Sequence, residues 1–134
     1  MSGFDLILEK KVPETELQKV ISDCFNIPEQ SIVITDDYID TPLTDNIRLW
    51  CMTNEVEGDF SLVCQFFIRD KSIKICPNMA SKRLSYILSF RCLIPDDSPN
   101  PLTWIMISPD GSEKPVILNS DELDNDRYVI CKSI

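Results

Sequence analysis

Residues 47–69 read IRLWCMTNEVEGDFSLVCQFFIR and contain two long strand-like runs, Ile47–Val56 and Phe60–Arg69. The tripeptide between them, residues 57–59, contains Gly58, whose conformational freedom suits a tight connection, so the stretch predicts a β-hairpin. In the second run, both sets of alternating side chains are apolar. A strand of that kind is buried on both faces, which predicts a hairpin in the interior of a sheet.

The residues before the hairpin predict a β-α-β unit. Phe4, Leu6 and Leu8 alternate with Asp5 and Glu9, as expected for a strand with one buried face. Pro13 suits the first turn of a helix, and apolar side chains recur at helical spacing over Leu17–Cys24. The β-branched run Ser31–Thr35 predicts the next strand.

The residues after the hairpin predict a second helix, a second hairpin and a last strand. Asn78 can cap the helix, and apolar residues continue at helical spacing as far as Cys92. The second hairpin joins Thr103–Ile107 to Val116–Leu118 through a Ser-Pro-Asp-Gly turn, whose proline and glycine positions favour type I. Arg127–Lys132 forms the last strand.

These elements predict a single α+β domain over residues 1–134, in the order β-α-β-β-β-α-β-β-β. Roughly seven strands form a mainly antiparallel sheet, and two helices pack on one of its faces. Two helices cannot cover both faces of such a sheet. We therefore expect charge or a binding partner to cover the other face or one edge.

The chain has 134 residues and no histidine. This absence excludes a Ser-His-Asp triad, a Cys-His dyad and any zinc site that contains histidine. There is also no P-loop, dinucleotide-binding glycine motif or G-x-S-x-G sequence. We predict no catalytic residue, no metal site and no cofactor. The chain is therefore not expected to be an enzyme. Catalysis by a carboxylate or by Cys76 is the alternative left open.

The six cysteines are spread along the chain without a C-x-x-C pair, and most lie in apolar runs. Reduced thiols that pack as small hydrophobic groups are the expected state in a cytoplasmic protein. Cys76, next to Pro77, is the cysteine that this pattern assigns least clearly. The N-terminus does not resemble a signal peptide, and no apolar run approaches the roughly 20 residues of a membrane span. We therefore predict a cytoplasmic protein without a membrane partner.

Acidic residues outnumber basic ones by 22 to 13, which gives a net charge of −9. The charge is uneven: residues 69–91, called the basic segment below, contain six cations and one acid, so this segment carries +5 and the rest of the chain −14. Such an anionic surface repels nucleic acid and attracts basic proteins, although solvated charge that serves solubility alone is the other interpretation. The aromatic residues, including Tyr86 and Trp104, are interpreted as core and not as a nucleic-acid stacking platform.

The acidic residues gather in predicted connections, where functional residues are often found. Their spacing lacks the glycine and the final glutamate of an EF-hand loop, so calcium binding is not predicted. We predict instead that they bind a protein partner. The candidate residues are Asp36, Asp37, Asp40, Asp45, Glu55, Glu57, Asp59, Asp121, Glu122, Asp124 and Asp126.

The β-α-β opening with Pro13, and the closing pattern of PNPLTW at residues 99–104 and SPDG at residues 108–111, resemble small acidic immunity proteins of bacterial contact-dependent inhibition and polymorphic toxin systems. The resemblance implies a single-domain cytoplasmic protein that neutralises one cognate toxin, often a nuclease, and no shared catalytic residues. The expected function is therefore an immunity-type inhibitor that binds a basic toxin domain, in particular a nuclease, through acidic loops. The alternative is an acidic secretion chaperone that binds an effector protein. The oligomeric state is left open, with a monomer favoured.

Overall fold

The structure is a computed structural model that describes residues 2–36, 44–73 and 76–133. The strands are β1 (Ser2–Leu8), β2 (Ile32–Thr35), β3 (Leu49–Glu55), β4 (Glu57–Gly58), β5 (Leu62–Ile68), β6 (Cys92–Pro95), β7 (Thr103–Ile107), β8 (Glu113–Leu118), β9 (Arg127–Tyr128) and β10 (Ile130–Ser133). The helices are α1 (Glu14–Phe25), α2 (Pro77–Leu88), α3 (Ser120–Leu123) and the 3-10 turn η1 (Glu29–Ser31).

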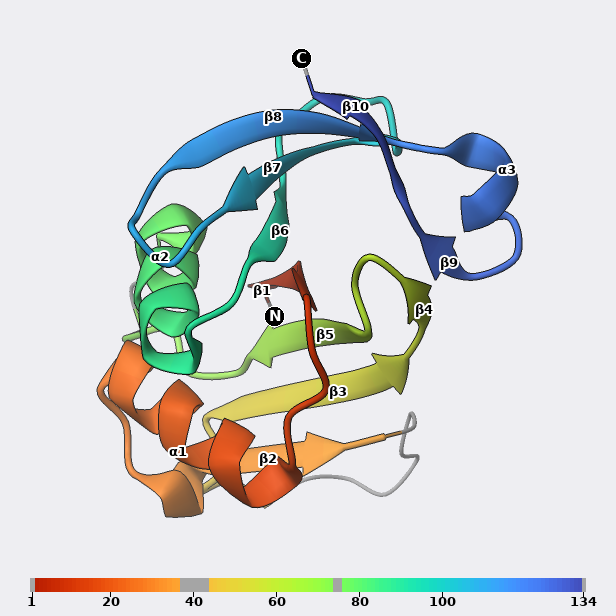
Figure 1. The fold of residues 1–134 in the computed structure, drawn as a ribbon. Coiled ribbons are helices and arrows are strands. Elements are labelled where there is room, and N and C mark those ends of the chain that lie inside the picture. The colour runs from red at the N-terminus through yellow and green to blue at the C-terminus, as the bar shows by residue number, and fades with distance from the viewer. Residues whose placement is uncertain (1, 37–43, 74–75, 134) are drawn as a thin grey trace.

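Eight strands form one sheet in the order β10-β8-β7-β6-β1-β5-β3-β2, and β4 and β9 form a separate parallel pair (Figure 1). Only β2 and β3 are parallel within the large sheet of the described residues. The predicted α+β class is confirmed. The expected numbers of seven strands and two helices are too low, because the described residues contain ten strands and three α-helices.

Strand β6 is the main element that the sequence prediction missed. Cys92 lies four residues after Leu88, so its spacing fits the helix, but α2 ends at Ser89 with a left-handed φ of 60°. Cys92 then begins β6, which lies between β1 and β7. The predicted cap was also displaced, since Pro77 occupies the first turn and Cys76, not Asn78, is the N-cap residue.

The predicted hairpin is present and lies in the interior of the sheet. Strands β3 and β5 are antiparallel over seven residue pairs, from Leu49 opposite Ile68 to Glu55 opposite Leu62. The connection between them forms β4, in which Gly58 has a φ of +107°. A Cβ atom at this position would lie 2.7 Å from the carbonyl oxygen of Tyr128, so glycine also permits the close pairing with β9.

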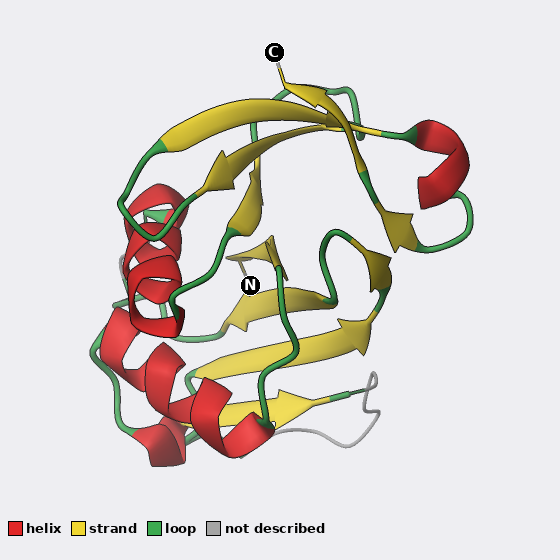
Figure 2. Cartoon of the chain, viewed as in Figure 1, coloured by secondary structure: helices red, strands yellow, loops and turns green. Residues whose placement is uncertain are grey.

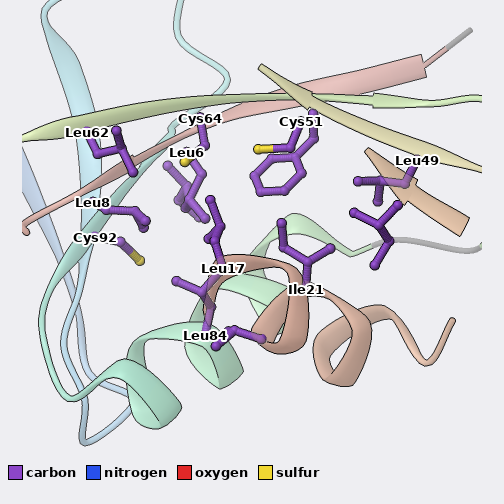
Figure 3. Packing of buried hydrophobic residues seen from close by; sticks show 14 of the residues in the cluster. Leu6, Leu8, Leu17, Ile21, Leu49, Cys51, Leu62, Cys64, Leu84 and Cys92 are labelled. Atoms are coloured by element: carbon purple, nitrogen blue, oxygen red, sulfur yellow. The ribbon is translucent and has the colours of Figure 1, made fainter. Parts of the chain in front are cut away.

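Both long helices cover the same face of the sheet, as predicted (Figure 2). Leu17 and Ile21 of α1 and Leu84 of α2 point toward the side chains of β1, β3 and β5 (Figure 3). Helix α1 begins after Pro13 and ends at Asn26, whose φ of 54° is left-handed. The apolar spacing of the sequence therefore placed α1 on its correct face.

The opposite face of the sheet has a core of its own, so this face does not need charge or a partner to cover it; the alternative, that one edge of the sheet is covered in this way, stays a prediction. Ile7, Phe60 and Leu93 are buried there, whereas the neighbours of Ile7 in β1 point to the helix side. Strands β6, β7, β8 and β10 arch over this second core (Figure 1). Leu123 of α3 and Tyr128 of β9 pack against it from the end of the arch.

Candidate partner-binding surface

The β4–β9 pair brings two of the predicted acidic segments together. The Glu57 N–H donates to the Asp126 carbonyl at 3.3 Å, and the Asp59 N–H donates to the Tyr128 carbonyl at 2.8 Å. The Asp59 carboxylate also accepts the N–H of Ile130 at 2.9 Å. Segments about 70 residues apart in the sequence thus form one surface.

Two further acidic residues reach the same end of the molecule through the parallel strands β2 and β3. Because β2 and β3 are parallel and Thr35 lies opposite Met52, Asp36, which follows β2, and Glu55, which ends β3, lie toward the same end of the sheet. The ends of β2 and β3, the β4–β9 pair and α3 lie along the right-hand side of Figure 1. We call this surface the acidic end; it consists of Asp36, Glu55, Glu57, Asp59, Asp121, Glu122, Asp124 and Asp126.

Not every predicted site residue belongs to the acidic end. Asp45 precedes β3, so the seven residues of that strand separate it from Glu55. A strand of this length spans about 20 Å, which places Asp45 at the opposite end of the sheet. Asp37 and Asp40 lie outside the described residues.

Half of the acidic end lies in connections, as predicted, and half lies in short strands and a helix. Glu55 closes β3, Glu57 lies in β4, and Asp121 and Glu122 lie in α3. The Asn119 side chain caps α3 by accepting the Glu122 N–H at 3.0 Å. These elements contain four of the eight carboxylates, and Asp36, Asp59, Asp124 and Asp126 lie in the connections next to them.

Few carboxylates of the acidic end form ion pairs. Lys11 Nζ lies 3.5 Å from Glu55 Oε2, and Arg127 Nε lies 2.7 Å from Glu122 Oε2. Within the part of the chain that the structure describes, the other six have no ion pair at 4.0 Å or less. Apart from half-buried Glu122, all eight residues are exposed. This end therefore presents anionic groups that an incoming cation can reach.

The basic segment is arranged differently, because carboxylates from outside it form ion pairs with three of its six cations. Lys82 Nζ lies 2.9 Å from Glu113 Oε2, and Arg83 Nη2 lies 3.0 Å from Asp23 Oδ1. Arg69 donates two hydrogen bonds to main-chain carbonyls. Half of the positive patch predicted from sequence is thus paired with carboxylates within the fold; Lys74 lies outside the described residues.

Arg91, at the end of the basic segment, makes the most extensive ion pair of this segment. Its Nη2 atom lies 2.8 Å from Glu9 Oε2, its main-chain N–H donates to Glu9 Oε1 at 2.8 Å, and its guanidinium carbon lies 5.6 Å from the centre of the Phe60 ring. Partial burial alone would raise the pKa of the Glu9 carboxyl, but the hydrogen bonds from Arg91 outweigh this effect and lower it overall. This contact joins β1 to the start of β6.

Three cysteines, Cys51, Cys64 and Cys92, are buried, whereas Cys76 and Cys131 are exposed. All six cysteines are free, and burial raises the pKa of the Cys92 thiol to about 12, far from the range of a reactive thiolate. Trp50 is buried, as expected for a core aromatic. Tyr86 is 73% exposed on α2, so its assignment to the core is wrong.

Within the described residues, no three potential metal-ligating side chains form a cluster, and no helix has both the length and the apolar composition needed to cross a membrane. The sequence also gave no indication that Lys11 and Arg127 border the acidic end, since both positions depend on long-range strand pairing. Comparisons of the chain with protein-family models, with curated proteins and with solved structures returned no match.

Proposed function

We propose that the protein is an immunity-type inhibitor that binds and neutralises a basic toxin domain through its acidic end. The observation that carries the proposal is the β4–β9 pairing, which collects carboxylates from distant segments on one end and leaves most of them without an ion pair. A nuclease is the toxin class that fits this surface best, because an enzyme that binds nucleic-acid phosphate has a cationic active site.

The physical advantage of this arrangement is rapid and selective association. An anionic surface raises the rate at which a cationic partner arrives by about 10- to 1,000-fold at low salt. Complementary charge also fixes the orientation of the complex and disfavours anionic partners. Carboxylates already paired within the fold contribute less to either effect.

The test is stopped-flow measurement of association between the pure protein and the toxin domain encoded by the neighbouring gene. The variant E57K/D121K/D124K reverses three exposed carboxylates of the acidic end. We expect its association rate to fall by about tenfold or more at low salt, and the salt dependence to become weaker. Inhibition of the toxin should decrease in parallel.

Asp45→Lys is the matched control, because it makes the same type of charge change at the opposite end of the sheet. We expect its association rate to stay within about twofold of the parent protein, since screening limits long-range effects. Equal losses for the control and the triple variant would contradict a role for the acidic end. A complex that leaves the toxin fully active would instead support the secretion-chaperone alternative.

A further inference from the structure

Strand β1 forms a long ladder of residue pairs along one edge and a short one along the other. Along β5 it pairs over seven residues, from Ser2 opposite Ile68 to Leu8 opposite Leu62. Along β6 the described ladder has only two pairs, Ile7 with Leu93 and Leu8 with Cys92. The two strands therefore separate over the first half of β1.

The sequence gives a physical reason for this separation. The Glu9 N–H donates to the Arg91 carbonyl at 3.0 Å, so odd-numbered residues of β1 direct their main-chain groups toward β6. Continuing the register beyond Ile7 would place Asp5 opposite Pro95. Proline has no N–H to donate to the Asp5 carbonyl, so the ladder stops there.

A cavity of about 930 Å³ lies where the strands separate. Its walls are the edge of β1 around Gly3 and Asp5, the end of β6 around Pro95, and the first turn of α2. It lies at the other end of β5 from the acidic end, since Gly3 is opposite Phe67 whereas Asp59 precedes β5. The cavity is therefore a second site and does not depend on the proposed inhibitor surface.

The two sides of the cavity differ in chemistry, because strand side chains alternate between faces. Phe4 and Ile94 belong to the helix-side core and give the cavity one apolar wall. Asp5 and Gln65 line the other side. Burial raises the pKa of the Asp5 carboxyl, and a hydrogen bond with Gln65 offsets part of this effect.

The charged side chains among the described residues of the lining are carboxylates. Asp5 is one of them. Asp97 adds another acid, and none of the described residues in the lining is a lysine or an arginine. This combination favours a ligand that supplies N–H donors and positive charge.

We propose that the cavity binds an extended peptide segment of another protein, which adds as a strand to the free edge of β1. The main-chain groups of Gly3 and Asp5 pair with the peptide backbone, as in other complexes formed by strand addition. Alternate residues of the peptide are apolar, against Phe4 and Ile94, and basic, toward Asp5.

The probe is the acetylated and amidated peptide Lys-Val-Lys-Val-Lys-Val, titrated into ¹⁵N-labelled protein and followed by the amide resonances. We expect saturable shifts at Gly3 and Asp5. The same peptide with every backbone amide N-methylated keeps its charge but cannot donate, and we expect these shifts to weaken by about tenfold or more through the lost hydrogen bonds. Shifts confined to the acidic end, or equal shifts with both peptides, would overturn the proposal.

Pro95→Ala provides the structural test, because it restores the N–H that lets β6 pair with Asp5. We expect the amide of the new alanine to become protected from hydrogen exchange, and the affinity for the peptide to fall by about tenfold. Pro99→Ala, in the exposed loop after β6, is the matched control and should bind as the parent protein does. A protected amide together with unchanged peptide affinity would overturn strand addition, whereas the toxin test at the acidic end would be unaffected.

Discussion

The acidic end and the basic segment both depart from the average charge of the chain, but they use their charged groups differently. In the basic segment, arginine and lysine side chains contact carboxylates of α1, of β8 and of Glu9, which directly follows β1, so that charge connects elements far apart in the sequence. At the acidic end, two of eight carboxylates form ion pairs. Charge in the first region contributes to the fold, while in the second it is available to a partner.

This difference could not be seen in the net charges of the two regions. Counting residues indicates a positive patch beside a negative surface, which would attract partners of either sign. Ion pairs neutralise three of the six cations of the patch, which weakens its positive field relative to the anionic surface. Substitutions that remove one charge from each region can test the contrast.

The largest expected effect is that of Arg91→Ala. It removes the bonds to the half-buried Glu9 carboxylate and the contact with the Phe60 ring. We expect the free energy of unfolding to fall by about 2 kcal/mol, between the values typical of exposed and buried pairs. Urea denaturation monitored by tryptophan fluorescence would measure it.

Arg127→Ala is the matched control at the acidic end, because Arg127 pairs with Glu122 at a similar distance but on a more exposed surface. Removing an exposed ion pair costs about 0–1 kcal/mol. Equal losses for Arg91→Ala and Arg127→Ala would show that the two regions do not differ in this way.

A smaller effect concerns acid stability at Asp70, the single acid of the basic segment. Hydrogen bonds from Ser72 and then from Arg48 lower the pKa of its carboxyl from 3.8 to about 2. Because the folded pKa is depressed, the stabilisation is complete above pH 3.8 and is lost as the pH falls toward 2. Asp70→Asn should flatten the loss of stability within this window, as measured by urea midpoints at successive pH values. If Asp70→Asn left the loss of stability at acidic pH unchanged, this loss could not be assigned to Asp70.

Local patterns in the sequence predicted the elements whose signals lie within a few residues. The apolar stripe of α1 identifies its buried face, and the structure confirms it. Strand β5 was predicted to be buried on both faces, but Leu62, Cys64, Phe66 and Ile68 are buried whereas the residues between them are only half-buried. Strand β6 was missed because Cys92 fits the helical spacing of α2. Ser89, which ends that helix with a positive φ, is not a residue type that typically marks a helix end.

The acidic end could be predicted only in part. The acidic residues themselves are visible in the sequence, but their assembly depends on β4 and β9, two-residue strands that pair across about 70 positions. Strands this short have no detectable periodicity. The same limit applies to the cavity. Pro95 indicates the end of a strand, but the sequence does not show that β1 is the neighbouring strand with which it cannot pair.

The smallest expected effect on stability is that of Glu57→Lys, which tests whether the charge of the acidic end is separable from its fold. Its side chain has no hydrogen bond or ion pair in the described part of the chain, and reversing it reduces repulsion among neighbouring carboxylates. We expect the free energy of unfolding to change by less than about 0.5 kcal/mol. Asp59→Ala is the informative contrast, because Asp59 accepts the Ile130 N–H and its removal should cost about 1 kcal/mol. If Glu57→Lys destabilised the protein as much as Asp59→Ala in urea denaturation, the carboxylates of this end would contribute to the stability of the fold. A slower association of the triple variant could then no longer be attributed to charge alone.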